Sequence, residues 1–98
     1  MTTFFVTRHA GALDWARGQN ITFDRHVTHL VPDEIGQGDS VLGSLPVHLA
    51  AEVCRRGARY FNLSLDLPEK LRGQELGAEA LRQCQGRLEE FTVRRAAP

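Results

Sequence analysis

The sequence is poor in cysteine, in net charge and in long apolar runs. Its 98 residues include two cysteines, one tryptophan, one tyrosine and one methionine. Cys54 and Cys84 are too few and too far apart for a disulfide framework or a zinc cluster, so we expect buried free thiols. The 12 basic and 12 acidic side chains leave a formal net charge of zero, which excludes a broad basic surface for long nucleic acid. An anionic ligand must therefore be held by a local basic site.

The sequence also lacks membrane and targeting signals. No apolar run approaches the ~20 residues that span a membrane, and the first residues have neither the basic region nor the hydrophobic segment of a signal peptide. We therefore expect a cytoplasmic protein without a membrane partner. A chain of this size can bury one hydrophobic core, so residues 1–98 are expected to form a single domain.

The clearest local pattern lies in residues 39–57, which predict a strand, a tight turn and a helix. The turn is Gly43-Ser44, Pro46 suits the first helical position, and Gly57 suits the left-handed position past the helix end. The apolar stripe expected to face the core consists of Val47, Ala50, Ala51 and Cys54. Because a strand that leads into a helix N-terminus can hold a phosphate, Gly43, Ser44 and Leu45 are candidate ligand-binding residues.

The remaining pattern predicts strands and helices in alternation. We expect strands at 3–7, 26–30 and 59–65, a short helix at 12–17, and a long helix from 77 to about 94 with the stripe Leu81, Cys84, Leu88 and Phe91. The segment 31–39 reads as a mobile surface loop, and 67–76 as a functional loop. This order predicts an α/β layer structure with a mainly parallel sheet flanked by helices.

Ligands of such sheets collect at the carboxyl ends of the strands. One predicted end is Thr7-Arg8-His9, where Arg8 could hold a phosphate and His9 could move a proton. Alternatively, His9 caps a helix or fills a loop. A second end is the Gly43-Ser44 turn, and a third carries Ser64 and Asp66, which we count as candidate ligand-binding residues.

Other polar residues have weaker patterns. His26 and His29 are expected on opposite faces of a strand, which favours structural roles over a shared metal site. His48 shares a helix face with Glu52, either as a solvated pair or as part of the ligand site. Arg72 and Glu75 lie in the loop 67–76, which is long enough to fold over a site. No grouping of side chains has the spacing of a metal site, so we expect no metal and no cofactor.

The segment Thr7-Arg-His-Ala-Gly11 resembles the Arg-His-Gly opening of histidine phosphatases, in which the histidine takes up the phosphoryl group. That fold normally needs a longer chain with a second His and Arg, so a phosphoryl hydrolase is a secondary hypothesis.

Several segments read together resemble the Csx-sixteen family, small CRISPR-associated proteins of type III systems. They are Val6–Trp15, His29-Leu30, Gly38–Val47, Leu49–Cys54, Arg56–Tyr60, Leu65–Pro68 and Arg72-Gly73 with Glu75-Leu76. The resemblance covers roughly residues 3 to 82 and depends on the order of the segments.

The resemblance implies a Rossmann-like domain similar to the CRISPR-associated sensors of cyclic oligoadenylate (CARF-like). It also implies ring-nuclease activity, the degradation of cyclic tetra-adenylate that switches off the antiviral signal; the alternative is a protein that binds the ring without cleaving it. The symmetry of the ring favours a homodimer. Attack of a ribose 2′-hydroxyl on the scissile phosphate needs no metal, and Arg8 with His9 would be the catalytic residues.

Overall fold

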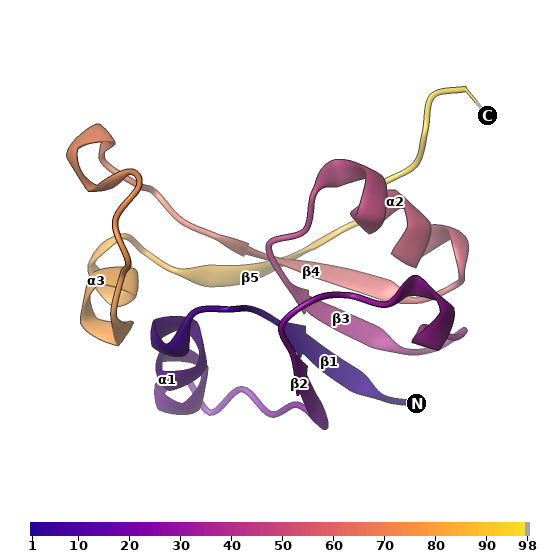
Figure 1. Ribbon diagram of the computed structural model, residues 1–98, viewed down its shortest axis with the longest axis horizontal. Helices are drawn as coiled ribbons and strands as arrows, with labels where there is room; N and C mark the ends of the chain where they lie inside the picture. Colours follow the sequence, from indigo (N-terminus) through magenta and orange to yellow (C-terminus); the bar gives the residue numbers. More distant parts are fainter. Residues whose placement is uncertain (98) are drawn as a thin grey trace.

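The computed structural model describes residues 1–97 and has the layered α/β architecture that the apolar pattern predicts (Figure 1). In chain order its main elements are β1 (Thr3–Val6), α1 (Ala10–Gly18), β2 (Arg25–Val27), β3 (Ser40–Gly43), α2 (Val47–Arg55), β4 (Arg59–Ser64), α3 (Ala78–Gln83) and β5 (Arg87–Phe91). Two 3₁₀ turns, Pro32–Glu34 and Glu69–Leu71, lie in the connections. Within residues 1–97, no helix is both long enough and apolar enough to cross a membrane.

The strands form one five-stranded sheet in the order β2-β1-β3-β4-β5. The pairs β1–β2, β1–β3 and β3–β4 are parallel, and β4–β5 is antiparallel. From β1 the chain crosses through α1 to one side, and from β3 it crosses through α2 to the other. The strand order therefore reverses between β1 and β3, and such a reversal opens a crevice beyond the carboxyl ends of those strands.

The two crossover helices cover opposite faces of the sheet, so the central strands are buried on both faces. Neighbouring residues of β1 point to opposite sides: Phe4 packs in the cluster under α2, and Phe5 in the cluster with α1 and α3. Trp15 is the largest fully buried side chain on the α1 side. In Figure 1, α1 and α3 lie next to each other and α2 lies across the sheet from them. The predicted Rossmann-like α/β class is confirmed.

The predicted long C-terminal helix is wrong. The helix α3 ends at Gln83, and the chain turns through Gln85, at φ +58°, and Gly86 into β5. Leu88 then pairs with Leu63 on the α1 side, whereas Phe91 lies on the other face and is 46% exposed. The spacing of Leu81, Cys84, Leu88 and Phe91 suits a helix. Without a further strand, however, β4 would be an uncovered edge of the sheet. Pairing with β4 therefore makes residues 87–91 a strand.

Three smaller predictions also need correction. The second strand is Arg25–Val27, so His29 lies beyond its end and not on a strand face. The first helix is longer than predicted, Ala10–Gly18. In α2, Ala50 and Ala51 are buried as predicted, but Val47 is 73% exposed and Val53 is buried in its place. The buried patch of α2 therefore begins only after its first turn.

Gly57 has the predicted left-handed conformation, at φ +83°. Both cysteines are free, with Cys84 buried and Cys54 partly exposed.

The segment 31–39 lies mostly at the surface, as its composition predicts, but Ile35 is 4% exposed and anchors the segment in the core under α2. Asp39 fixes its end by accepting hydrogen bonds from the backbone N–H groups of Gly36 and Thr2, each at 2.9 Å. These bonds, that of Gly36 first, lower the pKa of the Asp39 carboxyl.

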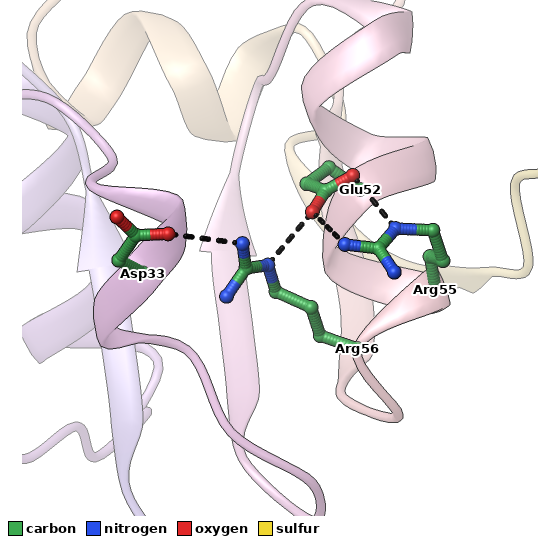
Figure 2. A network of polar contacts seen from close by, with 4 residues as sticks. All are labelled: Asp33, Glu52, Arg55 and Arg56. Carbon is green, nitrogen blue, oxygen red and sulfur yellow. Dashed lines mark hydrogen bonds and ion pairs between the residues drawn. The ribbon is translucent and has the colours of Figure 1, made fainter.

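A network of charged side chains fastens the same segment to α2 (Figure 2). Glu52 accepts hydrogen bonds from Arg55, at 2.6 and 3.0 Å, and from Arg56 Nε at 2.8 Å. Arg56 Nη2 also donates to Asp33 Oδ1 at 3.1 Å. The bonds from Arg55 and then Arg56 lower the pKa of Glu52 to about 2.

Gly43 lies beside Val6 at the end of β3, and we predict that Gly43→Ala destabilises the fold. Its φ is +145°, and a Cβ there would clash with the carbonyl oxygen of Val6. Backbone strain of this kind costs about 1–3 kcal/mol, and each 1 kcal/mol lowers the melting temperature of a domain this size by roughly 4–8 °C.

The measurement is thermal unfolding, and Gly77→Ala is its matched control. Gly77 has φ −82°, and a Cβ there would meet nothing within 4 Å, so this variant should melt close to the wild type. Equal melting temperatures for Gly43→Ala and the wild type would contradict the prediction.

The low pKa of Glu52 predicts that the fold loses stability in acid. Its folded pKa of about 2 lies below the ordinary 4.5, so its contribution to stability is present above pH 4.5 and is lost as the pH falls through about 2. Glu52→Gln should therefore lower stability at neutral pH and flatten its decline between those two pH values. Denaturant unfolding across the acid range measures this. Glu79→Gln, whose partner Arg82 lies in the same helix, controls for the loss of one negative charge; equal acid profiles for the two variants would contradict the prediction.

Candidate ligand-binding site

The crevice at the strand-order reversal contains a cavity of about 510 Å³. Its wall is built from the ends of β1 and β3, the segment that follows β2, and the loop before α3. It is lined by Phe5, Val6, Thr7, Arg8, His9, Ala12, Thr28, His29, Leu30, Gly43, Ser44, Leu45, Pro46, Leu49, Leu63, Leu65, Gln74, Leu76 and Leu81. This volume is within the usual range for a small-molecule site.

Six of the ten residues predicted for the site meet around this cavity. They are Thr7, Arg8, His9, Gly43, Ser44 and Leu45. Parallel pairing explains this, because Val6 is paired with Gly43 and the residues that follow each of them leave the same edge of the sheet. Their roles toward a ligand stay predictions.

The other four predicted residues, His48, Ser64, Asp66 and Arg72, are not in the cavity wall. Ser64 accepts a hydrogen bond from Asn62 Nδ2 at 2.9 Å, and Asp66 Oδ1 lies 3.4 Å from Arg87 on β5. His48 and Arg72 are exposed. The expected pairing of His48 with Glu52 does not occur, since Glu52 bonds to arginines instead.

The predictions missed the contribution of the segment after β2. Because β2 ends at Val27, Thr28, His29 and Leu30 continue past the sheet into the cavity wall. The shorter strand also places His26 differently: its Nε2 lies 2.8 Å from the carbonyl oxygen of Thr7, which links β2 to the Thr7–His9 segment.

Arg8 supplies the accessible positive charge of the cavity. It is exposed, and within residues 1–97 no hydrogen bond or ion pair joins its side chain to another residue of the chain. A guanidinium binds phosphate oxygens through two parallel hydrogen bonds. Arg8 can therefore bind an anion without first giving up an internal partner.

His9 follows directly and is held from the loop before α3. Its Nδ1 lies 2.7 and 2.9 Å from the two carboxylate oxygens of Glu75. The loop 67–76 therefore reaches the site, with Gln74 and Leu76, the two neighbours of Glu75, in the cavity wall.

The turn between β3 and α2 is held by a buried tyrosine. Tyr60, 3% exposed, accepts a hydrogen bond from the backbone N–H of Leu45 at 2.9 Å and lies 2.6 Å from Asn62 Oδ1. Burial raises the pKa of Tyr60. The hydroxyl therefore stays protonated and donates a hydrogen bond to Asn62 Oδ1. Ser44 Oγ donates to the carbonyl of Leu63 at 3.2 Å.

These bonds change the role expected for the turn. The Leu45 amide is already used by Tyr60, so it is not available to a phosphate in this conformation. The turn therefore gives the cavity its shape, while the charge that an anion needs comes from Arg8.

The cavity divides into a polar and an apolar part. Thr7, Arg8, His9, Thr28, His29, Ser44 and Gln74 supply the polar side chains. Leu63 and Leu65, with Leu76 and Leu81, form an apolar wall against the core on the α1 side. A ligand that combines an anionic group with an apolar part matches this division. Residues 1–97 contain no group of three or more His, Cys, Asp or Glu side chains placed to hold a metal ion.

Comparison with known protein families gives a match over nearly the whole chain. A family model matches residues 4–94, and its description is "Putative CRISPR-associated protein (Cas_VVA1548)". No curated protein and no solved structure matches the sequence significantly. The match supports the CRISPR association that the resemblance implies, while the finer expectation of ring-nuclease activity stays a prediction. Since the model covers nearly the whole chain, this protein belongs to the Cas_VVA1548 family of CRISPR-associated proteins.

Proposed function

We propose that this protein is an accessory protein of type III CRISPR systems that binds cyclic tetra-adenylate and degrades it without a metal ion. The observation that carries the proposal is the cavity at the strand-order reversal, with Arg8 and His9 in its wall at the end of the central strand β1. Membership of a CRISPR-associated family supports the context. The apolar wall suits an adenine, and the exposed guanidinium of Arg8 suits a phosphate.

The proposed reaction is an internal transfer at phosphorus. The ribose 2′-oxygen forms a bond to the phosphorus as the bond from phosphorus to the 5′-oxygen breaks, which leaves a 2′,3′-cyclic phosphate and a 5′-hydroxyl. The 2′-hydroxyl loses a proton and the 5′-oxygen gains one. In this proposal His9 carries one of these transfers, and Arg8 stabilises the charge that develops on the phosphate oxygens.

A ring of four nucleotides is larger than a single small-molecule ligand, so one cavity would hold only part of it. A twofold dimer would present two identical cavities to a ligand that itself has rotational symmetry. We therefore propose a homodimer with the ring across its axis.

The first experiment is cleavage of a molar excess of cyclic tetra-adenylate in EDTA, followed by chromatography. Turnover beyond one ring per site supports an enzyme, whereas stoichiometric retention of intact ring indicates a binding protein.

We expect Arg8→Ala to lose a charge-assisted contact of about 1.5–3 kcal/mol, which weakens ring binding roughly tenfold to hundredfold. His9→Ala should slow cleavage by roughly 10²–10⁴ if it transfers a proton.

Arg17→Ala is the matched control, because Arg17 pairs with Asp14 on α1 and is not in the cavity wall. It should cleave at the wild-type rate. Folded Arg8→Ala and His9→Ala variants that also cleave at that rate would place the reaction elsewhere, and loss of cleavage in EDTA that manganese or magnesium restores would overturn metal independence.

Light scattering tests the dimer. We expect a particle of twice the 10.9 kDa chain mass, in the presence of cyclic tetra-adenylate if not before. A mass that stays at that of one chain with saturating ring present would contradict the symmetric arrangement.

A further inference from the structure

The contact between His9 and Glu75 joins residues that are 66 positions apart. Both carboxylate oxygens approach the same ring nitrogen, Nδ1, at 2.7 and 2.9 Å. The side chains are 57% and 66% exposed, and an ion pair this exposed contributes little to stability. The contact does, however, determine which ring nitrogen of His9 faces a carboxylate.

Close packing holds the residues that follow Glu75. The next residues, Leu76 and Gly77, lie directly on the first turn of α1. A Cβ at Gly11 would clash with the carbonyl oxygen of Leu76 and lie 2.9 Å from the Cα of Gly77. Leu76 packs against the core cluster of α1 and α3. Since α1 starts at Ala10, immediately after His9, the same contact brings Glu75 to the imidazole.

An ionised carboxylate can only accept hydrogen bonds, so the His9 nitrogen that faces it must carry a proton. With Nδ1–H directed at Glu75, Nε2 is the nitrogen left for a ligand in the cavity that His9 lines. A neutral imidazole in this state offers Nε2 as a proton acceptor. A carboxylate that orients a histidine in this way increases its efficiency as a base without touching the substrate.

We propose that Glu75 is a positioning residue for His9, and that the packing of the loop 67–76 on α1 brings this carboxylate to the imidazole. The effect on cleavage rests on the proposed function. The effect on the imidazole does not.

The test is ¹⁵N NMR of the His9 ring, at a pH well above the usual range of histidine titration, together with the cleavage assay. In the wild type the ring should carry its proton on Nδ1. In Glu75→Ala it should shift toward the Nε2–H form, and cleavage should fall by about tenfold or more, up to the roughly 10²–10⁴-fold that proton transfer contributes. Glu75→Asp, which keeps the carboxylate, should restore part of both.

Two further variants separate positioning from a general change of charge or stability. Glu79→Gln removes a carboxylate that lies four positions after Glu75 and pairs with Arg82; it should leave the His9 signals and the cleavage rate as in the wild type. Gly11→Ala should displace the loop and change the His9 signals as Glu75→Ala does, although Glu75 itself is intact. If Gly11→Ala does not fold, the Glu75 variants decide the question.

The two proposals fail differently. Unchanged ring signals and unchanged cleavage in Glu75→Ala would overturn the positioning role alone. If the wild type leaves cyclic tetra-adenylate intact while the His9 tautomer still follows Glu75, the proposed function fails and the positioning role stands.

Discussion

The parallel pairing of β1 with β3 is the constraint on which the rest of this structure depends. It places Val6 beside Gly43, so the chain leaves the sheet at two adjacent points and continues in opposite directions. The two crossovers then cover opposite faces, and the crevice between them lies beyond the carboxyl ends of both strands. A glycine is needed at this point because the Val6 carbonyl occupies the space where a side chain would begin.

The candidate site combines a buried support with an exposed polar part. Tyr60 is held in the core and fixes the turn after β3 through the Leu45 amide. Arg8 and His9, in contrast, are exposed. A surface arginine and histidine keep their hydration until a ligand displaces it, which limits the cost of holding charge in a small domain. Their geometry depends on neighbours, and His26 and Glu75 supply contacts to this segment from two other parts of the chain.

Much of this arrangement is readable from local sequence. Local patterns indicate the strands: the β-branched and aromatic residues mark β1, the Gly43-Ser44 turn marks the end of β3, and the alternation marks β4. Parallel strands then bring their carboxyl ends to one edge of the sheet. What local sequence does not contain is the choice of partner. The residues of β5 have the spacing of a helix, and only the unpaired edge of β4 makes them a strand. Likewise, Glu75 is 66 residues from His9 and Tyr60 is 15 from Leu45, so neither contact leaves a periodic signal.

The central claim is that the ligand binds at the strand-order reversal between β1 and β3. The most direct measurement is a titration with cyclic tetra-adenylate of a ¹⁵N-labelled variant that cannot cleave the ring. The readout is the chemical shift of each backbone amide. The account predicts saturable shifts concentrated in Thr7–His9, in Gly43–Leu45 and in the loop 67–76, with β5 and the segment after it unaffected. Shifts confined to the groove formed by Cys54, Arg55 and Thr92–Arg95, or no shifts at saturating ligand, would contradict it.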